Sequence, residues 1–337
     1  MKILKTLLPF LLIILLLSCE EEVEFDLDFQ ESLVVQGSIE PMMPAYVILT
    51  KTQSYFSEIN PSTYENSFVS NAEIWIRKGN NQEKKLLNSV EINTIYPGLD
   101  LPSCFYAEDP INPIADGPGT YHLKIIYNND TITSVTTIPN SEALDSLWFE
   151  VDPLSNSDSL GYVWAKVTDP DTLGNNVMIR HKRIYHNKKI TLYKQNDSVI
   201  YINQPDSFFI STLWGSVRSD FEGLNGNSFV TYFARGNSFL GHQDPPEEYG
   251  YFKTGDTVML KFSQIDEASA KFWRQVEAQG WANQDPFSEP MNLTGNVNGA
   301  LGIWSGYGAK YYKVPIYENA TITNNLPINS LSVFDIL

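Results

Sequence analysis

The chain of 337 residues has only two cysteines, four histidines, and 23 basic residues against 40 acidic ones. Two cysteines are too few for a disulfide scaffold. A net charge of −17 argues against nucleic acid as a partner, because binding to phosphates depends on clustered Lys and Arg. Beyond residue 17, no apolar run approaches the roughly 20 residues that a membrane-spanning helix needs. These absences leave an acidic chain whose body is expected to lie outside the membrane.

Catalytic motifs are also missing. The sequence contains no His-Glu-x-x-His helix, no Gly-x-Ser-x-Gly elbow and no P-loop. His181 and His186 are the closest pair of histidines, and their odd separation places them on opposite faces of a regular strand. We therefore expect no catalytic residue and no cofactor. Scattered Ser, His and Asp side chains could still converge, so a hydrolase stays open as a less favoured alternative.

The best candidate for a cation site is weak. Asp169 and Asp171 lie in the segment 168–176, where closely spaced carboxylate and amide oxygens suit hard cations such as calcium. Asp-Pro and Gly-Asn are also common turn formers, and the segment joins two strand-like runs. We favour the turn and expect no metal centre.

The N-terminus has the layout of a secretory signal: Lys2 and Lys5, an apolar run over 7–17, and a small residue before Cys19. The sequence Leu-x-x-Cys resembles the bacterial lipoprotein signal, which implies removal of residues 1–18 and acylation of Cys19 by palmitate-type chains. Two or more chains anchor a protein stably to a membrane. Removing residues 1–18 takes away two lysines and no acid, so the net charge falls from −17 to −19.

An acidic segment, 19–32, follows the signal and is interpreted as a tether. Glu20, Glu21 and Glu22 come directly after Cys19. One interpretation is a charged spacer that keeps the body off the membrane. The interpretation that we favour is that these residues resemble the surface-export signal of Bacteroidota lipoproteins, which implies exposure on the outer face of the outer membrane.

The rest of the chain is predicted to be all-β. Short β-rich runs separated by turns over 33–140 predict an Ig-like β-sandwich. The pieces 71–76 and 117–123 resemble transthyretin-like and carboxypeptidase-regulatory-like sandwich domains. A turn cluster at 139–142 suggests a domain boundary. Further strand-like runs over 141–337 predict a larger antiparallel barrel or second sandwich.

One helix is predicted within the C-terminal domain, near residues 266–279. Asp266 can cap it by accepting a hydrogen bond from the Ser269 amide, apolar residues recur at helical spacing, and Gly280 is placed to end it. Its apolar face is expected to cover one end of the C-terminal sheet rather than to form an aromatic ligand box.

A tripeptide of Asp, then Ser or Thr, then a mostly apolar residue occurs six times. It resembles the O-glycosylation sequon of Bacteroidota periplasmic and surface proteins. The same tripeptide is typical of a turn that starts a strand, and both interpretations can hold at one site. The hydroxyls concerned are Thr131, Ser146, Ser159, Thr172, Ser198 and Thr257.

The order of several weak motifs resembles a Bacteroidota lipoprotein family, the domain-of-unknown-function 4249 family. These motifs are 18–21, 33–37, 138–147, 285–290 and the glycine-rich aromatic segment 295–307. The resemblance implies an outer-membrane lipoprotein that is often encoded beside a TonB-dependent receptor, and it implies no catalytic residue. The glycines and aromatics of 295–312 could be tight corners and packing, which we favour, or could line a carbohydrate or peptide groove.

Together these observations predict a surface-exposed, non-catalytic binding lipoprotein that assists a TonB-dependent transporter in nutrient uptake. The alternative is a carbohydrate- or peptide-binding lipoprotein that acts alone through exposed Trp and Tyr side chains.

Overall fold

The computed structural model describes residues 29–54, 57–58, 60–99, 101–192, 198–219, 225–236, 246–282, 292–327 and 330–331, with side chains described outside 187–202 and 281–282. Residues 32–337 form one compact unit. None of the helices in the described ranges is long and apolar enough to cross a membrane. Cys19 and the residues of the acidic tether up to 28 lie outside the described part.

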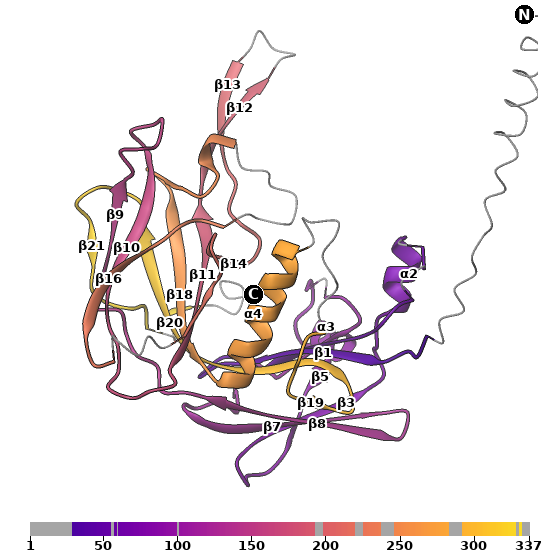
Figure 1. Cartoon of the computed structure of the whole chain (residues 1–337). Coiled ribbons are helices and arrows are strands. Elements are labelled where there is room, and N and C mark those ends of the chain that lie inside the picture. Colours follow the sequence, from indigo (N-terminus) through magenta and orange to yellow (C-terminus); the bar gives the residue numbers. More distant parts are fainter. Residues whose placement is uncertain are drawn as a thin grey trace, which may run out of the picture. The chain divides into compact units, whose positions relative to one another are not determined.

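The described fold is mainly β, as predicted, and is built from three sheets and a separate hairpin (Figure 1). The strands of the first half are β1 (Leu33–Ile39), β2 (Tyr46–Lys51), β3 (Glu73–Lys78), β4 (Lys84–Lys85), β5 (Leu87–Asn88), β6 (Phe105–Ala107), β7 (Gly119–Tyr127) and β8 (Asp130–Ile138). Two short helices, α2 (Pro61–Asn66) and α3 (Ser89–Ile95), lie between them and were not predicted.

The second half adds the strands β9 (Ser146–Val151), β10 (Leu160–Thr168), β11 (Asn176–Tyr185), β12 (Asn187–Leu192), β13 (Ser198–Asn203), β14 (Ile210–Ser211), β15 (Val217–Ser219), β16 (Ser228–Phe233), β17 (Phe252–Lys253), β18 (Thr257–Ile265), β19 (Val297–Asn298), β20 (Leu301–Pro315) and β21 (Thr321–Ile322). It also holds the 3₁₀ turn η1 (Pro246–Glu248) and the long helix α4 (Glu267–Ala282).

The nine-stranded sheet is shared by two sandwiches. Its order is β14-β11-β18-β20-β1-β2-β6-β5, with β15 beside β11. One hydrophobic cluster joins β1 and β2 to the five-stranded sheet β19-β8-β7-β3-β4, here the β7–β8 sheet. A second cluster joins β11, β18 and β20 to the sheet β16-β10-β9-β21, here the β9–β10 sheet. The described strands therefore form sandwiches, and the closed-barrel alternative for the C-terminal half is wrong because none of these sheets closes.

Strand β20 connects the two halves. It pairs antiparallel with β18 and parallel with β1, so residues 301–306 and 33–39 lie side by side in one sheet. This mixed pairing was not predicted. The buried residues of the first cluster come from before residue 139, apart from Trp304 of β20. Those of the second cluster come from after residue 143. A domain boundary near residue 140 stays a prediction.

Ten of the fifteen residues of β20 are buried, because both faces of the strand are covered. Its even-numbered residues, such as Trp304 and Tyr312, point into the two sandwiches, and its odd-numbered residues, such as Tyr307, pack under α4. Gly37 of β1 leaves room for the indole of Trp304, since a Cβ there would lie 2.4 Å from the ring. Packing is thus the role of the aromatics of 295–312, as we favoured.

The predicted helix is confirmed, with a shifted end. The Ser269 amide donates to Asp266 Oδ1 over 2.9 Å, as the sequence indicated. Asp266 Oδ2 also accepts from the Thr136 hydroxyl at 2.8 Å and the Thr137 amide at 2.9 Å, which ties the helix to β8. Helix α4 runs through Gly280 to Ala282, so this glycine does not stop it.

Candidate functional site

An aromatic surface covers the outer face of the β9–β10 sheet. Strand alternation places Val163 and Ala165 of β10 in the core and Tyr162 and Trp164 on the opposite face. Trp164 pairs across the sheet with Tyr232 of β16 and with Trp148 of β9. Three large rings therefore stand in one row across three strands.

Two more rings extend this row. Tyr251 precedes β17, and Trp214 lies in the loop between β14 and β15. The ring centroid of Tyr162 lies 4.8 Å from that of Tyr232 and 5.2 Å from that of Tyr251. Tyr232 also contacts Trp164, at 5.1 Å, and Trp214, at 5.9 Å. Trp214 is 55% exposed and Tyr232 40%, so the cluster is open to solvent at its centre.

Polar groups border these rings. The Trp148 indole donates to Glu150 Oε1 over 2.6 Å, and the Tyr251 hydroxyl donates to Asp152 Oδ2 over 3.2 Å. Burial, and then the hydrogen bond with Tyr251, raise the pKa of the Tyr162 phenol well above its ordinary value, so it stays protonated at neutral pH. The aromatic surface is defined here as Trp148, Tyr162, Trp164, Trp214, Tyr232 and Tyr251. It combines two exposed and four half-buried rings with hydrogen-bonding groups.

A buried ionic cluster lies at the base of the β12–β13 hairpin. Asp206 accepts hydrogen bonds from Arg235 Nη1 at 2.9 Å and Nη2 at 3.0 Å, and from the Arg183 amide at 2.7 Å. His186 Nδ1 lies 3.0 Å from Asp256 Oδ1. The side chains of His186 and Asp256 are each 2% exposed, which closes this pair to a substrate. The cluster joins four segments of the chain and is a structural element.

His181 belongs to the same buried region. The Gly236 amide donates to its Nε2 at 3.2 Å. Burial, and then the positive charge of Arg235, hold the pKa of His181 well below its usual range, so the ring is neutral. The two histidines that sequence reasoning compared are therefore both packed in the interior with different partners.

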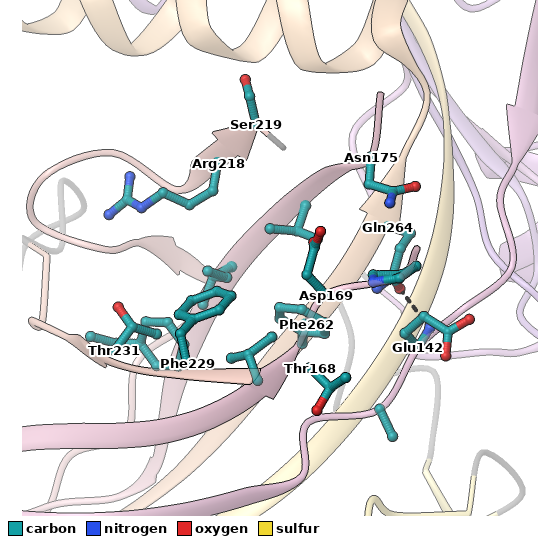
Figure 2. Close-up of a pocket in the computed structure, with 16 residues that line it drawn as sticks. Glu142, Thr168, Asp169, Asn175, Arg218, Ser219, Phe229, Thr231, Phe262 and Gln264 are labelled. Atoms are coloured by element: carbon teal, nitrogen blue, oxygen red, sulfur yellow. Dashed lines mark hydrogen bonds between the residues drawn. The ribbon is translucent and has the colours of Figure 1, made fainter. Parts of the chain in front are cut away.

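A small cavity of about 120 Å³ opens between the β9–β10 sheet and the nine-stranded sheet (Figure 2). Its walls are mainly apolar, with Val177, Phe229 and Phe262 among them, and its rim carries Glu142, Asp169 and other polar side chains. The Glu142 amide donates to Gln264 Oε1 over 3.0 Å at this rim.

The weak cation candidate lies beside this cavity. Asp169 lines the rim, and its amide donates to the Asn227 carbonyl over 3.0 Å. Asp171 is exposed and accepts from Asn225 Nδ2 at 3.4 Å. In the ranges that the structure describes, no group of three His, Cys, Asp or Glu side chains is placed to hold a metal ion. The segment connects β10 and β11, where a turn was predicted.

The other predicted sites are placed as follows. Cys19 and Glu20 to Glu22 lie outside the described residues. Among the sequon hydroxyls, Thr131 and Thr172 are exposed, Ser146, Ser159 and Thr257 are half-buried, and the side chain of Ser198 lies outside the description. Asp256, which precedes Thr257, is committed to the buried ionic cluster. Cys104 is buried, at 2% exposure.

Sequence reasoning considered exposed Trp and Tyr residues but did not locate the aromatic surface. The alternation of Tyr162 and Trp164 with buried apolar residues could have marked the face of β10 that carries it. The contributions of Trp214 and Tyr251 depend on tertiary packing and leave no local signal.

Comparison with known proteins supplies a family. A crystal structure of a mutant of Salmonella alpha-2-macroglobulin is similar at 8% identity and a TM-score of 0.22, over 86% of this chain and 15% of that protein, which is too distant to guide interpretation. No curated protein matches the chain. The family model described as a domain of unknown function (DUF4249) matches residues 20–312, and the chain therefore belongs to this family.

Proposed function

We propose that this protein is a non-catalytic, lipid-anchored protein of the outer-membrane surface that binds glycans through its aromatic surface. The observation that carries the proposal is the set of contacting rings, open at Trp214 and Tyr232, on one face of the β9–β10 sheet. Exposed aromatic clusters of this extent mark binding sites, because soluble proteins seldom leave them uncovered.

The chemistry of the surface favours a carbohydrate. Tyr and Trp rings offer flat apolar faces with a polar edge, which matches the C–H face and the hydroxyl rim of a pyranose. Glu150 and Asp152 place carboxylate acceptors beside the rings, where sugar hydroxyls can donate to them. The ligand is a neutral or basic glycan, since the chain has a net charge of −17.

The anchor and the cellular role extend the proposal. Acylation at Cys19 would hold the body at the membrane, and Glu20 to Glu22 would direct it to the outer face. There the protein would present bound glycan to a TonB-dependent transporter. Affinity purification of the tagged protein from native membranes tests this part, and recovery without any such transporter counts against it. Replacing Glu20 to Glu22 with alanine should abolish protease access on intact cells if they direct export.

The binding surface is tested with a glycan array followed by calorimetry on the best glycan. Trp214→Ala and Tyr232→Ala should each weaken binding about tenfold, equivalent to about 1.4 kcal/mol, because each removes one stacking ring. Tyr64→Ala is the matched control, since Tyr64 is an exposed tyrosine of α2 outside the aromatic surface. Equal affinity of all three variants and the wild type would place the glycan site elsewhere.

A further inference from the structure

Strand β16 is the six-residue edge of the β9–β10 sheet. In the described ranges β10 is the strand that pairs with it. The Asp169 amide donates to the Asn227 carbonyl, which marks residues 169 and 227 as a hydrogen-bonded pair in this register. Hydrogen-bonded and non-hydrogen-bonded pairs alternate along an antiparallel ladder. The backbone groups of residues 229, 231 and 233 therefore face β10. Those of Ser228, Val230 and Tyr232 face away from β10, and no backbone hydrogen bond in the described ranges engages them. Just beyond the strand, the Ala234 carbonyl accepts from the Leu213 amide at 3.1 Å, so the segment 212–213 covers the C-terminal end of this edge, and Ser228 and Val230 are the positions most open to an added strand.

Before residue 234, this edge lacks the usual protection. Natural edge strands are blunted by short length, charge, proline or a bulge. The strands at the other ends of the three sheets, β14, β5, β19, β4 and β21, are two residues long. Strand β16 is Ser-Phe-Val-Thr-Tyr-Phe, with no charge and no proline, and its register with β10 is regular. An exposed edge of this kind is a template for strand addition.

The cavity lies beside the same strand. Phe229, Thr231 and Phe233 of β16 line it, together with Val177 and Ile179 of β11. Figure 2 shows Phe229 and Thr231 on one side, with Arg218 and Ser219 of β15 across from them. A volume of about 120 Å³ approaches the roughly 150 Å³ that holds a benzene ring, so one apolar side chain fits.

We propose that β16 accepts an extended segment of a partner protein as an additional strand, with an apolar side chain of that segment in the cavity. Strand addition of this kind draws its affinity from backbone hydrogen bonds and its specificity from pockets for alternate side chains. The cavity supplies the pocket on the inner face, and the exposed Val230 and Tyr232 supply contacts on the outer face.

The charge of the chain selects the partner. A second copy would bring the same net charge of −17, and like charge opposes association. A neutral or basic segment meets no such repulsion, and its apolar residue at every second position would face the cavity. The segment is therefore a neutral or basic extended peptide, and this assignment does not depend on glycan binding.

The experiment pans a phage-displayed library of random 12-residue peptides on the detergent-purified full-length protein. Enriched peptides are synthesised and tested by fluorescence anisotropy, with each amide N-methylated in turn. Methylation should weaken binding at least tenfold at every second amide and less than twofold at those between, since alternate amides face β16.

Two variants address the edge and the cavity separately. Val230→Pro removes an outward N–H, which an edge strand tolerates, and should weaken binding at least tenfold. Val230→Thr keeps that N–H and should bind within twofold of the wild type. Thr231→Phe fills the cavity and should abolish the preference for an apolar residue in the peptide. Circular dichroism confirms that each variant is folded.

Three results would overturn the proposal. The first is that no peptide enriched by panning binds the wild type more tightly than it binds the Val230→Pro variant. The second is an N-methylation profile without a period of two. The third is a concentration-dependent dimer in sedimentation velocity that Val230→Pro abolishes, which would make a second copy the occupant. Loss of glycan binding in Trp214→Ala leaves all three readouts unchanged.

Discussion

Asp206→Ala should destabilise the protein severely. Asp206 is 3% exposed and accepts hydrogen bonds from the side chains of Arg183 and Arg235, with the two Arg235 bonds at 2.9 and 3.0 Å. Removing the carboxylate leaves two buried guanidinium groups without this counter-charge, and breaking a buried ion pair costs about 3–5 kcal/mol. Urea unfolding followed by tryptophan fluorescence measures the free energy of unfolding.

The matched control is an ion pair at the surface. Asp116 pairs with Lys78, and the Asp116 side chain is 72% exposed. Asp116→Ala should therefore change the free energy of unfolding by no more than about 1 kcal/mol. If Asp206→Ala costs as little as Asp116→Ala, the buried ionic cluster does not support the base of the hairpin.

The same cluster predicts a pH dependence. Burial alone would raise the pKa of Asp206, but the charges of Arg235 and Arg183 outweigh it and hold the pKa below the ordinary value of 3.8. A carboxyl whose pKa is lower in the folded state than in the unfolded state stabilises the fold at any pH above its unfolded-state pKa. This stabilisation is lost as the pH falls through the folded-state pKa. The stability difference between wild type and Asp206→Asn should be constant above about pH 5 and shrink below about pH 4. A difference that is flat down to pH 3 would contradict this.

Three further predictions concern the helix cap, a glycine of β20 and the buried cysteine. Asp266→Ala removes the cap of α4 and its two bonds to β8, and should cost about 2 kcal/mol in urea unfolding; no change would show that the cap is dispensable. Gly302 has φ +104°, and a Cβ added there would lie 1.9 Å from the Val35 carbonyl oxygen, so Gly302→Ala should lower the free energy of unfolding by at least about 2 kcal/mol. The control is Gly280→Ala in α4, which should be neutral or stabilising because an added Cβ meets open space there. Cys104 is buried, and burial raises the pKa of its thiol, so a thiol reagent at pH 8 should label it only after unfolding; rapid labelling of the folded protein would disprove its burial.

Local patterns were enough to predict the all-β class, the helix near 266–279 and the packing role of the segment 295–312. Each of these depends on short-range signals: alternation in strands, a capping aspartate, and glycines beside aromatic residues. The parallel pairing of β20 with β1 could not be predicted in this way, because it joins residues more than 260 positions apart. The short helices α2 and α3 were missed, although Asn60 and Asn88 each form a capping box.

The candidate site was less predictable than the fold. Tyr162, Trp164 and Tyr232 lie on strands whose alternation is visible in sequence, yet Trp214 and Tyr251 reach the same surface from loops. The edge at β16 is also a tertiary property, since any β-rich run can lie in the middle of a sheet. The described strand order places it at an end, and the tertiary packing sets it beside a cavity that four other strands also line.

The proposed function depends first on glycan binding by the aromatic surface. The most direct measurement is calorimetry of the double variant Trp214→Ala, Tyr232→Ala against Tyr64→Ala, with the glycan that binds most strongly on an array. Loss of measurable binding by the double variant, with wild-type affinity in Tyr64→Ala, is the predicted result. Unchanged affinity in a folded double variant would show that the glycan does not bind at these rings.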